Sequence, residues 1–385
     1  MIPHMSAQWR DALDRWLAAG LLDEAAAARI RAWEAGHATH AGRSRLSAII
    51  FGLGGLLLAA GVLLFVAAHW GDISPGSRFA LVMAMVAVLH LGGALTNGSN
   101  PALSTTLSAV GTAAFGAGIF LAGQIFNLAE HWPGALLLWA LGAAVGLYLL
   151  RDWPHVLWVA VLAPAWLCSE WIVANEGPRF FLEYTVIASG VTLLAVAYLA
   201  AACDGRATVW RKALSRLGAI ALIPAVILLG ASHERGFLSE LQPNATASTG
   251  WLVMAWMAAI ALPSILIFLL RGRQAVWFAA AVAWVLIVGR FDWSFDGGEL
   301  AFYALCALGA AGVVYWGLKD QQRLHVNVGI LGFALAIAAF YFSSLFDKLG
   351  RSLGLIGMGV LFIGGGWLLE RTRRTLVERI DGGKA

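Results

Sequence analysis

The sequence predicts an all-α fold, a polytopic transmembrane helix bundle of about 12 spans that follows a short N-terminal cytoplasmic helical hairpin. Two observations carry this prediction. Hydrophobic residues make up 60% of the 385 residues and charged residues only 12%, whereas a soluble domain has roughly 45–50% and about 25%. The chain also has 44 Gly and 18 Trp, and both types are frequent in membrane helices or at their interfaces. A soluble fold is therefore excluded, and the lipid bilayer is the expected surrounding of most of the chain.

Residues 1–42 are predicted to form the cytoplasmic helical hairpin. Gly20 suits the C-terminal end of a first helix, and Asp23 suits the N-cap of a second. A hairpin this short cannot bury enough apolar surface to fold alone, so we expect it to lie on the membrane interface or on the cytoplasmic loops. It would act as a docking cap for the bundle, or as a partner or regulatory module. The apolar stripes of the two helices contain Leu13, Trp16, Leu17, Ile30 and Trp33.

The transmembrane bundle is predicted over residues 43–370, followed by a basic cytoplasmic tail over residues 371–385. A spanning helix needs about 20 mainly apolar residues, and runs of that length recur between polar clusters. The ninth run is short because Arg290 ends it early. We expect spans at 47–68, 77–95, 103–125, 133–150, 154–173, 180–202, 214–231, 250–270, 275–289, 299–317, 325–342 and 352–369.

The distribution of Lys and Arg supports this topology. Cytoplasmic loops next to spans carry an excess of basic residues. With the N-terminus in the cytoplasm, 20 of the 26 basic residues fall on inside segments and 6 on outside segments. One missed span would disturb this alternation downstream, so the count favours 12 spans with both termini cytoplasmic.

Catalytic, metal-binding and nucleic-acid-binding patterns are absent from the sequence. It contains no GxSxG, HExxH or Walker motif. Cys168, Cys203 and Cys306 lie far apart and match no metal-ligand spacing. The Arg residues are scattered among hydrophobic segments and form no basic face for nucleic acid. We therefore expect no enzymatic activity, no metal and no cofactor.

Few ionisable residues lie inside the predicted spans. His90 is within span two, where we expect a neutral histidine that is hydrogen-bonded to a neighbouring helix. A proton-coupled carrier usually has a carboxylate near the membrane midplane, and none is predicted here, which disfavours an antiporter. Span three has a nearly continuous surface of small residues, including Gly116 and Gly118. Such a helix either packs closely against its neighbours or lines a polar path.

Amides, carboxylates and histidines gather at the predicted outer ends of spans one, three and five. Because these ends share one membrane face, we predict that they form one outward-facing binding site. Amides and carboxylates suit a polar or cationic solute, and the predicted outer face is net negative, which attracts cations. The alternative is that each residue caps its own helix at the interface. The predicted site residues are His69, Asp72, Gln124, Asn127, Glu130 and Glu170.

Four stretches of the chain resemble a known family. They read WLAAGLLDEAAAARI, FVAAHWGDI, GAGIFLAGQIFNLAEHWPGALLLWALGAAVGLYLLR and VNVGILGFALAIAAFYFSSLFDKLGRSLGLIGMGVLFIGGGWLLERTRR. The chain is similar in these stretches to the bacterial membrane family of domain of unknown function 2157, most strongly at both ends and weakly from about 155 to 300. The family usually has Asn at the position of His69. The resemblance implies a bacterial inner-membrane location and, as a partner, an envelope protein with a Gly-Asp-Tyr motif domain. It implies no reaction.

Two functions remain open from the sequence. The first is a transporter or channel for a small solute, with spans three, five and six around an outward-opening polar cavity. The second is a non-transporting membrane subunit that docks an envelope (periplasmic) protein on its acidic outer face. An intramembrane enzyme ranks third, because no nucleophile and base are seen together.

Overall fold

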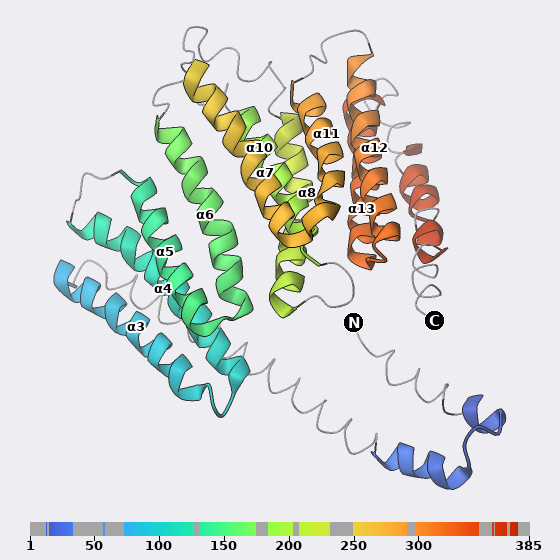
Figure 1. Ribbon diagram of the computed structural model, residues 1–385, viewed down its shortest axis with the longest axis horizontal. Helices are drawn as coiled ribbons and strands as arrows, with labels where there is room; N and C mark the ends of the chain where they lie inside the picture. Colours follow the sequence, from blue (N-terminus) through green and yellow to red (C-terminus); the bar gives the residue numbers. More distant parts are fainter. Residues whose placement is uncertain are drawn as a thin grey trace. The chain divides into compact units, whose positions relative to one another are not determined.

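The structure is a computed structural model. All regular secondary structure in its described residues is helical (Figure 1). This confirms the predicted fold class for that part of the chain. The chain divides into two compact units, Met1–Arg78 and Phe79–Ala385. The described residues are 13, 15–33, 57, 73–126, 131–174, 184–202, 208–231, 249–290, 297–345, 356–357, 359–367 and 370–375.

In the first unit, the two local signals of the predicted hairpin have the expected geometry. Gly20 has a φ of +69°, the left-handed conformation that glycine adopts at little cost after a helix. The Asp23 carboxylate accepts a hydrogen bond from the backbone N–H of Ala26 at 2.7 Å, as an N-cap does. The role of this segment as a docking or regulatory module stays a prediction.

Ten apolar helices occupy the positions of the second to the eleventh predicted spans. Eight of them are long and apolar enough to cross a membrane, and α7 and α11 are shorter. Predicted spans 47–68 and 352–369 lie largely or partly outside the described residues, so the total of 12 stays a prediction. The helices are α3 (Pro75–Thr96), α4 (Pro101–Phe126), α5 (Pro133–Leu150), α6 (Trp153–Ala174), α7 (Tyr184–Leu199), α8 (Val209–Ala231), α10 (Thr249–Arg271), α11 (Phe278–Arg290), α12 (Gly298–Lys319) and α13 (Arg323–Phe340).

The shortness of α11 has a local cause. The 3-10 helix η2 (Gly272–Trp277) precedes it and leaves only 13 residues for the α-helix. At 1.5 Å per residue these span about 20 Å, less than the roughly 30 Å of a bilayer core. The α-helical part of the ninth predicted span is therefore too short to cross a bilayer core by itself.

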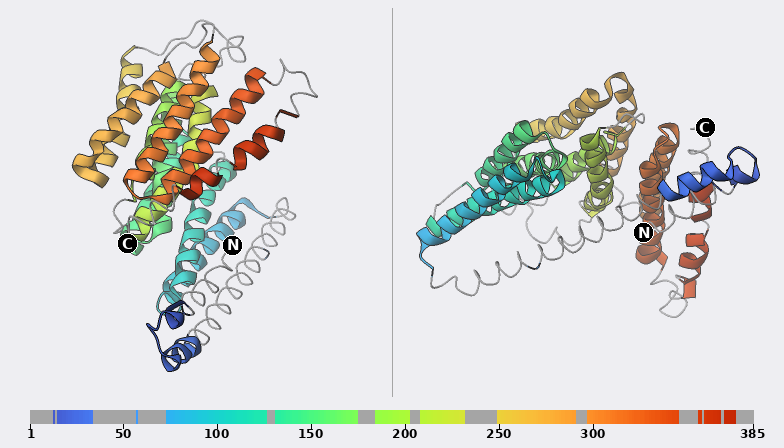
Figure 2. Two further views of the ribbon diagram at one scale, coloured as in Figure 1. Left: turned by 90° about the vertical axis from the view of Figure 1, so that its right-hand side faces the viewer. Right: turned by 90° about the horizontal axis from the view of Figure 1, so that it is seen from below.

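Consecutive helices pack as neighbouring pairs in the second unit. The pairs α5 with α6, α7 with α8 and α12 with α13 lie side by side, while α10 and α11 pack on α7 (Figures 1 and 2). The largest apolar core lies among α7, α8, α10 and α11 and includes the buried Leu193, Leu229 and Val285. Backbones touch where α7 meets α8, because a Cβ on Gly218 would lie 2.2 Å from the Leu199 nitrogen. Only glycine allows this approach.

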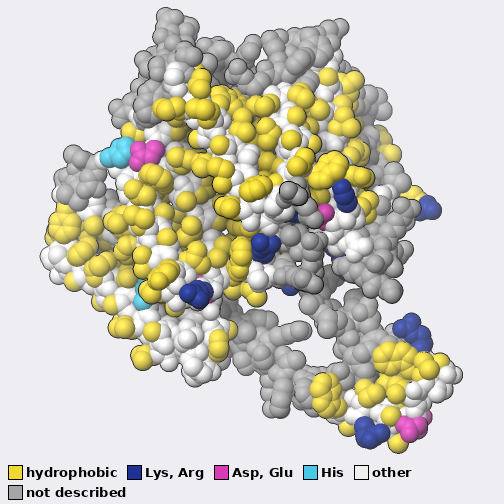
Figure 3. Space-filling view, viewed as in Figure 1, with side chains coloured by type: hydrophobic (Ala, Val, Ile, Leu, Met, Phe, Trp, Pro, Cys, Tyr) yellow, Lys and Arg dark blue, Asp and Glu magenta, His cyan; other side chains and the backbone are white. Residues whose placement is uncertain are grey.

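The outer surface of the helices is apolar. Large side chains such as Leu95 and Ile363 are 83% and 78% exposed, and hydrophobic side chains cover much of the visible face of the bundle (Figure 3). A surface this apolar requires lipid contact. The structure thus agrees with an integral membrane protein.

Candidate functional site

The structure describes two of the six predicted outer-site residues, Gln124 and Glu170. His69, Asp72, Asn127 and Glu130 lie outside the described residues. Gln124 is exposed near the end of α4 and Glu170 is partly exposed on α6. The convergence of all six residues on one site stays a prediction.

Glu170 has two partners at this end of the bundle. Its carboxylate is 2.6 Å from Nε2 of His131, which precedes α5, and it accepts a hydrogen bond from the Trp166 indole at 2.9 Å. His131 belongs to the polar segment that follows predicted span three. The structure therefore joins that segment to α6 through an imidazole.

The small residues of α4 pack closely against neighbouring helices. A Cβ on Gly116 would lie 2.1 Å from the ring of Trp139, and one on Gly118 would lie 2.9 Å from Val82. The indoles of Trp139 and Trp158 donate hydrogen bonds to the carbonyls of Thr112 and Ala109. Of the two readings of span three, these contacts favour close packing over a polar path.

Two histidines bond differently from each other. Nδ1 of His90 lies 2.9 Å from the carbonyl of Val86, which belongs to the same helix. The prediction that His90 is hydrogen-bonded to a neighbouring helix is therefore wrong. His155 is fully buried, with Nδ1 2.6 Å from Asp152 Oδ1 and Nε2 2.9 Å from the Thr112 hydroxyl. The Thr112 hydroxyl also donates a hydrogen bond to the Ser108 carbonyl of its own helix at 3.1 Å. The contact between Thr112 and His155 joins α4 to α6 inside the bundle.

A proline explains one further contact between helices. Pro164 lies inside α6 and has no N–H to offer the carbonyl four residues earlier. That carbonyl belongs to Ala160, and the Tyr198 hydroxyl of α7 donates to it at 2.7 Å. The proline therefore creates an acceptor, and the neighbouring helix satisfies it.

A second polar cluster lies where α7, α10, α12 and α13 meet. The Arg271 side chain is 5% exposed and forms an ion pair with Asp320. Its Nε donates to the carbonyl of Ala200 at 2.9 Å, just beyond the end of α7, where a cation is favourable. The guanidinium also lies 5.2 Å from the ring centroid of Trp316, whose indole donates to Asp320. The buried cation is thus fully paired.

His325 is buried beside this cluster. Its ring meets Trp316 edge-to-face at a centroid distance of 4.5 Å. Neither ring nitrogen has a hydrogen-bond partner among the described residues. Polar groups that are buried in this way usually have a partner, so His325 is a position where water or a ligand would be stabilised.

A cavity of about 1980 Å³ opens between these C-terminal helices, next to the Arg271 cluster. Its described lining comes from α7, α8, η2, α10–α13 and the π-helix η3 (Tyr341–Leu345), and most of it is apolar. Of the predicted spans three, five and six, only span six, which is α7, contributes. The large cavity is therefore not where the sequence predicted an outward-opening one.

The two ends of the cavity carry opposite charge. Glu299 lines one end, where the Ser343 hydroxyl donates a hydrogen bond to it. At the other end the lining contains Lys212, Arg271 and Lys319 with Asp320. We call this second end the basic end; it belongs to the side that the Lys and Arg count predicts to be cytoplasmic.

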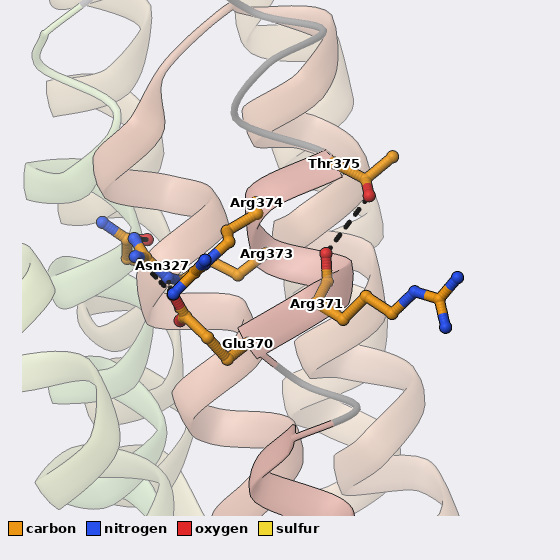
Figure 4. A network of polar contacts seen from close by, with 6 residues as sticks. All are labelled: Asn327, Glu370, Arg371, Arg373, Arg374 and Thr375. Carbon is orange, nitrogen blue, oxygen red and sulfur yellow. Dashed lines mark hydrogen bonds and ion pairs between the residues drawn. The ribbon is translucent and has the colours of Figure 1, made fainter.

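The C-terminal segment is held to α13 by a separate polar network (Figure 4). Glu370 bonds Arg373 and Arg374, each at 2.8 Å, and Arg373 also reaches the Asn327 amide oxygen at 3.4 Å. The two guanidinium groups lower the pKa of Glu370 from 4.5 to about 2. Figure 4 shows Arg371 pointing away from this network.

The sequence left His155 and His325 without a role. Both lie at the starts of predicted spans, where a histidine is an ordinary interfacial residue. For His155 the local signal is Asp152, three residues earlier, but its second partner, Thr112, lies 43 positions away. For His325 the ring contact comes from Trp316 on a separate helix, which no local pattern indicates.

The comparisons with known proteins identify a family over part of the chain. Residues 14–156, a little over a third of the chain, match the family described as Predicted membrane protein (DUF2157). This confirms the resemblance for that region, and the similarity of the C-terminal stretch stays a prediction. No curated protein and no solved structure matches the chain.

Proposed function

We propose that this integral membrane protein is a carrier or channel that moves a small amphipathic solute along the cavity between α7 and α13. One observation carries the proposal. The cavity lining follows α12 from Glu299 to Asp320, essentially all of a 22-residue helix, which at 1.5 Å per residue is about 33 Å long. That length is close to the roughly 30 Å thickness of a bilayer core.

The chemistry of the lining supports an amphipathic solute over a small ion. The middle of the cavity is lined by residues such as Cys306, Gly309 and Val313, and an ion there would lose hydration without gaining a partner. In the described lining, the charged residues lie at the two ends. A molecule with an apolar body and a polar head matches this arrangement, and its passage requires no chemical conversion.

The predicted outer site is a second candidate. The contact between His131 and Glu170 supports a polar assembly at the outer ends of α4–α6, and such an assembly suits a polar or cationic solute. The same surface would suit a docked envelope protein with a Gly-Asp-Tyr motif domain. These roles use a different part of the molecule, so mutations can separate them from transport through the cavity.

The test is lipid-label transport in proteoliposomes. The full chain is reconstituted with a nitrobenzoxadiazole-labelled lysophospholipid, and dithionite is added outside. In empty liposomes only the outer-leaflet label is quenched. With the protein, we expect the inner-leaflet label to become quenched as well.

One variant and one control connect transport to the cavity. Gly312 lines the cavity and a Cβ there would meet no neighbouring atom within 4 Å, so Gly312→Phe is expected to add a ring to the path. Gly123 of α4 also faces open space but does not line the cavity. We expect Gly312→Phe to abolish the additional quenching and Gly123→Phe to retain it. Equal transport by both variants, at equal reconstituted amounts, would contradict the proposal.

A further inference from the structure

The basic end of the cavity has an excess of positive charge. Its described lining has three cations, Lys212, Arg271 and Lys319, and one carboxylate, Asp320. Arg271 and Asp320 pair with each other. Lys212 and Lys319 are both exposed and have no ion-pair partner among the described residues. In the described part of this end, two cations therefore have no carboxylate partner.

An aromatic side chain marks the same place as interfacial. The Lys319 ammonium lies 4.1 Å from the ring centroid of Trp277, and the Trp277 side chain is 68% exposed. Trp and Lys together are typical of the headgroup level of a bilayer, and both residues line the cavity. This contact supports a position of the basic end at the headgroup level.

The cavity as a whole is too large, and its lining too apolar, for a free anion. Pockets for drug-sized ligands measure about 300–1,000 Å³, and this one measures about 1980 Å³. Its apolar part continues along α12 for several turns. At the opposite end, Glu299 would repel an anionic group. An anionic ligand would therefore be oriented with its charge at the basic end.

We infer that the basic end binds the phosphodiester headgroup of an anionic phospholipid, whose acyl chains lie in the apolar part of the cavity. Basic pockets between membrane helices on the cytoplasmic side bind anionic headgroups in this way. The inference rests on the proposed function in placing the solute in this cavity, and it names the solute class and its orientation.

The experiment is lipid binding to the delipidated full-length protein, measured by native mass spectrometry in detergent. Phosphatidylglycerol and phosphatidylcholine with identical acyl chains are the probes. We expect phosphatidylglycerol to bind more tightly. The double variant Lys212→Gln/Lys319→Gln should weaken its binding about 30-fold, at roughly one surface-charge contribution per Lys, and leave phosphatidylcholine binding unchanged.

A matched control separates the site from general surface charge. Arg371 also lies over an exposed tryptophan, 5.4 Å from the ring centroid of Trp367, but it does not line the cavity. Arg371→Gln should retain the preference for phosphatidylglycerol. Gly312→Phe adds a ring to the apolar part, so it should weaken both lipids without changing their ratio.

Several outcomes would overturn the inference. They are equal binding of the two lipids, an unchanged preference in the double lysine variant, unchanged binding in Gly312→Phe, or displacement of phosphatidylglycerol by inorganic phosphate alone. Binding and transport can fail separately. Lost lipid preference with intact label transport would reject only this inference, and intact binding without transport would reject only the proposed function.

Discussion

In α4 and α5, rings from neighbouring helices fill the space beside each of several glycines, whereas Gly312 of α12 faces open space. A Cβ on Gly116 would meet Trp139 at 2.1 Å, and one on Gly142 would meet Phe115 at 2.4 Å. Beside Gly312 no atom lies within 4 Å, and the residue lines the cavity. The same residue type therefore builds tight packing at Gly116 and Gly142 and an opening at Gly312. A ring faces each of the first two positions, and no neighbouring side chain faces the third.

The largest expected effect comes from exchanging glycine for leucine at Gly116 of α4, compared with the same exchange at Gly312 of α12. Gly116→Leu should lower the free energy of unfolding by about 1–3 kcal/mol, because it overpacks the Trp139 contact. Gly312→Leu should change it by less than about 0.5 kcal/mol, since a Cβ at this position meets no neighbouring atom within 4 Å. Thermal unfolding in detergent measures both. Equal melting temperatures for the two variants would contradict the distinction between a packed Gly116 and an open Gly312.

The next effect, of comparable size, is expected from two buried threonines, one in α4 and one in α7. The Thr112 hydroxyl contacts His155 on another helix, whereas the Thr192 hydroxyl bonds only the Ala188 carbonyl of its own helix. Thr112→Val should cost about 1–3 kcal/mol, because buried Nε2 of His155 loses its partner. Thr192→Val should cost less, since the Ala188 carbonyl keeps its helical bond. Denaturation of both variants in one detergent checks the order, and the reverse order would contradict it.

The smallest effect concerns the C-terminal segment beside α13. The pKa of Glu370 is lowered from 4.5 to about 2, so its ion pairs contribute stability above about pH 4.5 and lose it as the pH falls toward 2. We expect the melting temperature of the wild type to exceed that of Glu370→Gln at pH 7. The difference should shrink between pH 4.5 and 2 and also with added salt, because the pairs are exposed. A difference that stays constant down to pH 2 would exclude this account.

The positions of the helices follow from local sequence. Ten predicted spans coincide with helices because an apolar run, a proline or glycine and a charge each act within a few residues. The contacts of the predicted site residues could not be predicted in the same way, because they join different segments. Of its residues, only Gln124 and Glu170 are described, and the partners of Glu170 include His131 from before the next helix.

The sequence by itself determined that this is a helical membrane protein, where ten of its apolar helices lie, and that α4 has a small-residue surface. Only the tertiary structure decided what those residues do. Arg271, which the sequence placed among the cytoplasmic loop charges, is buried and bonded to a carbonyl 71 residues away. The large cavity depends in the same way on which helices face one another. Hydropathy and charge act locally along the chain, whereas packing, ion pairs and open space arise between segments that only folding brings together.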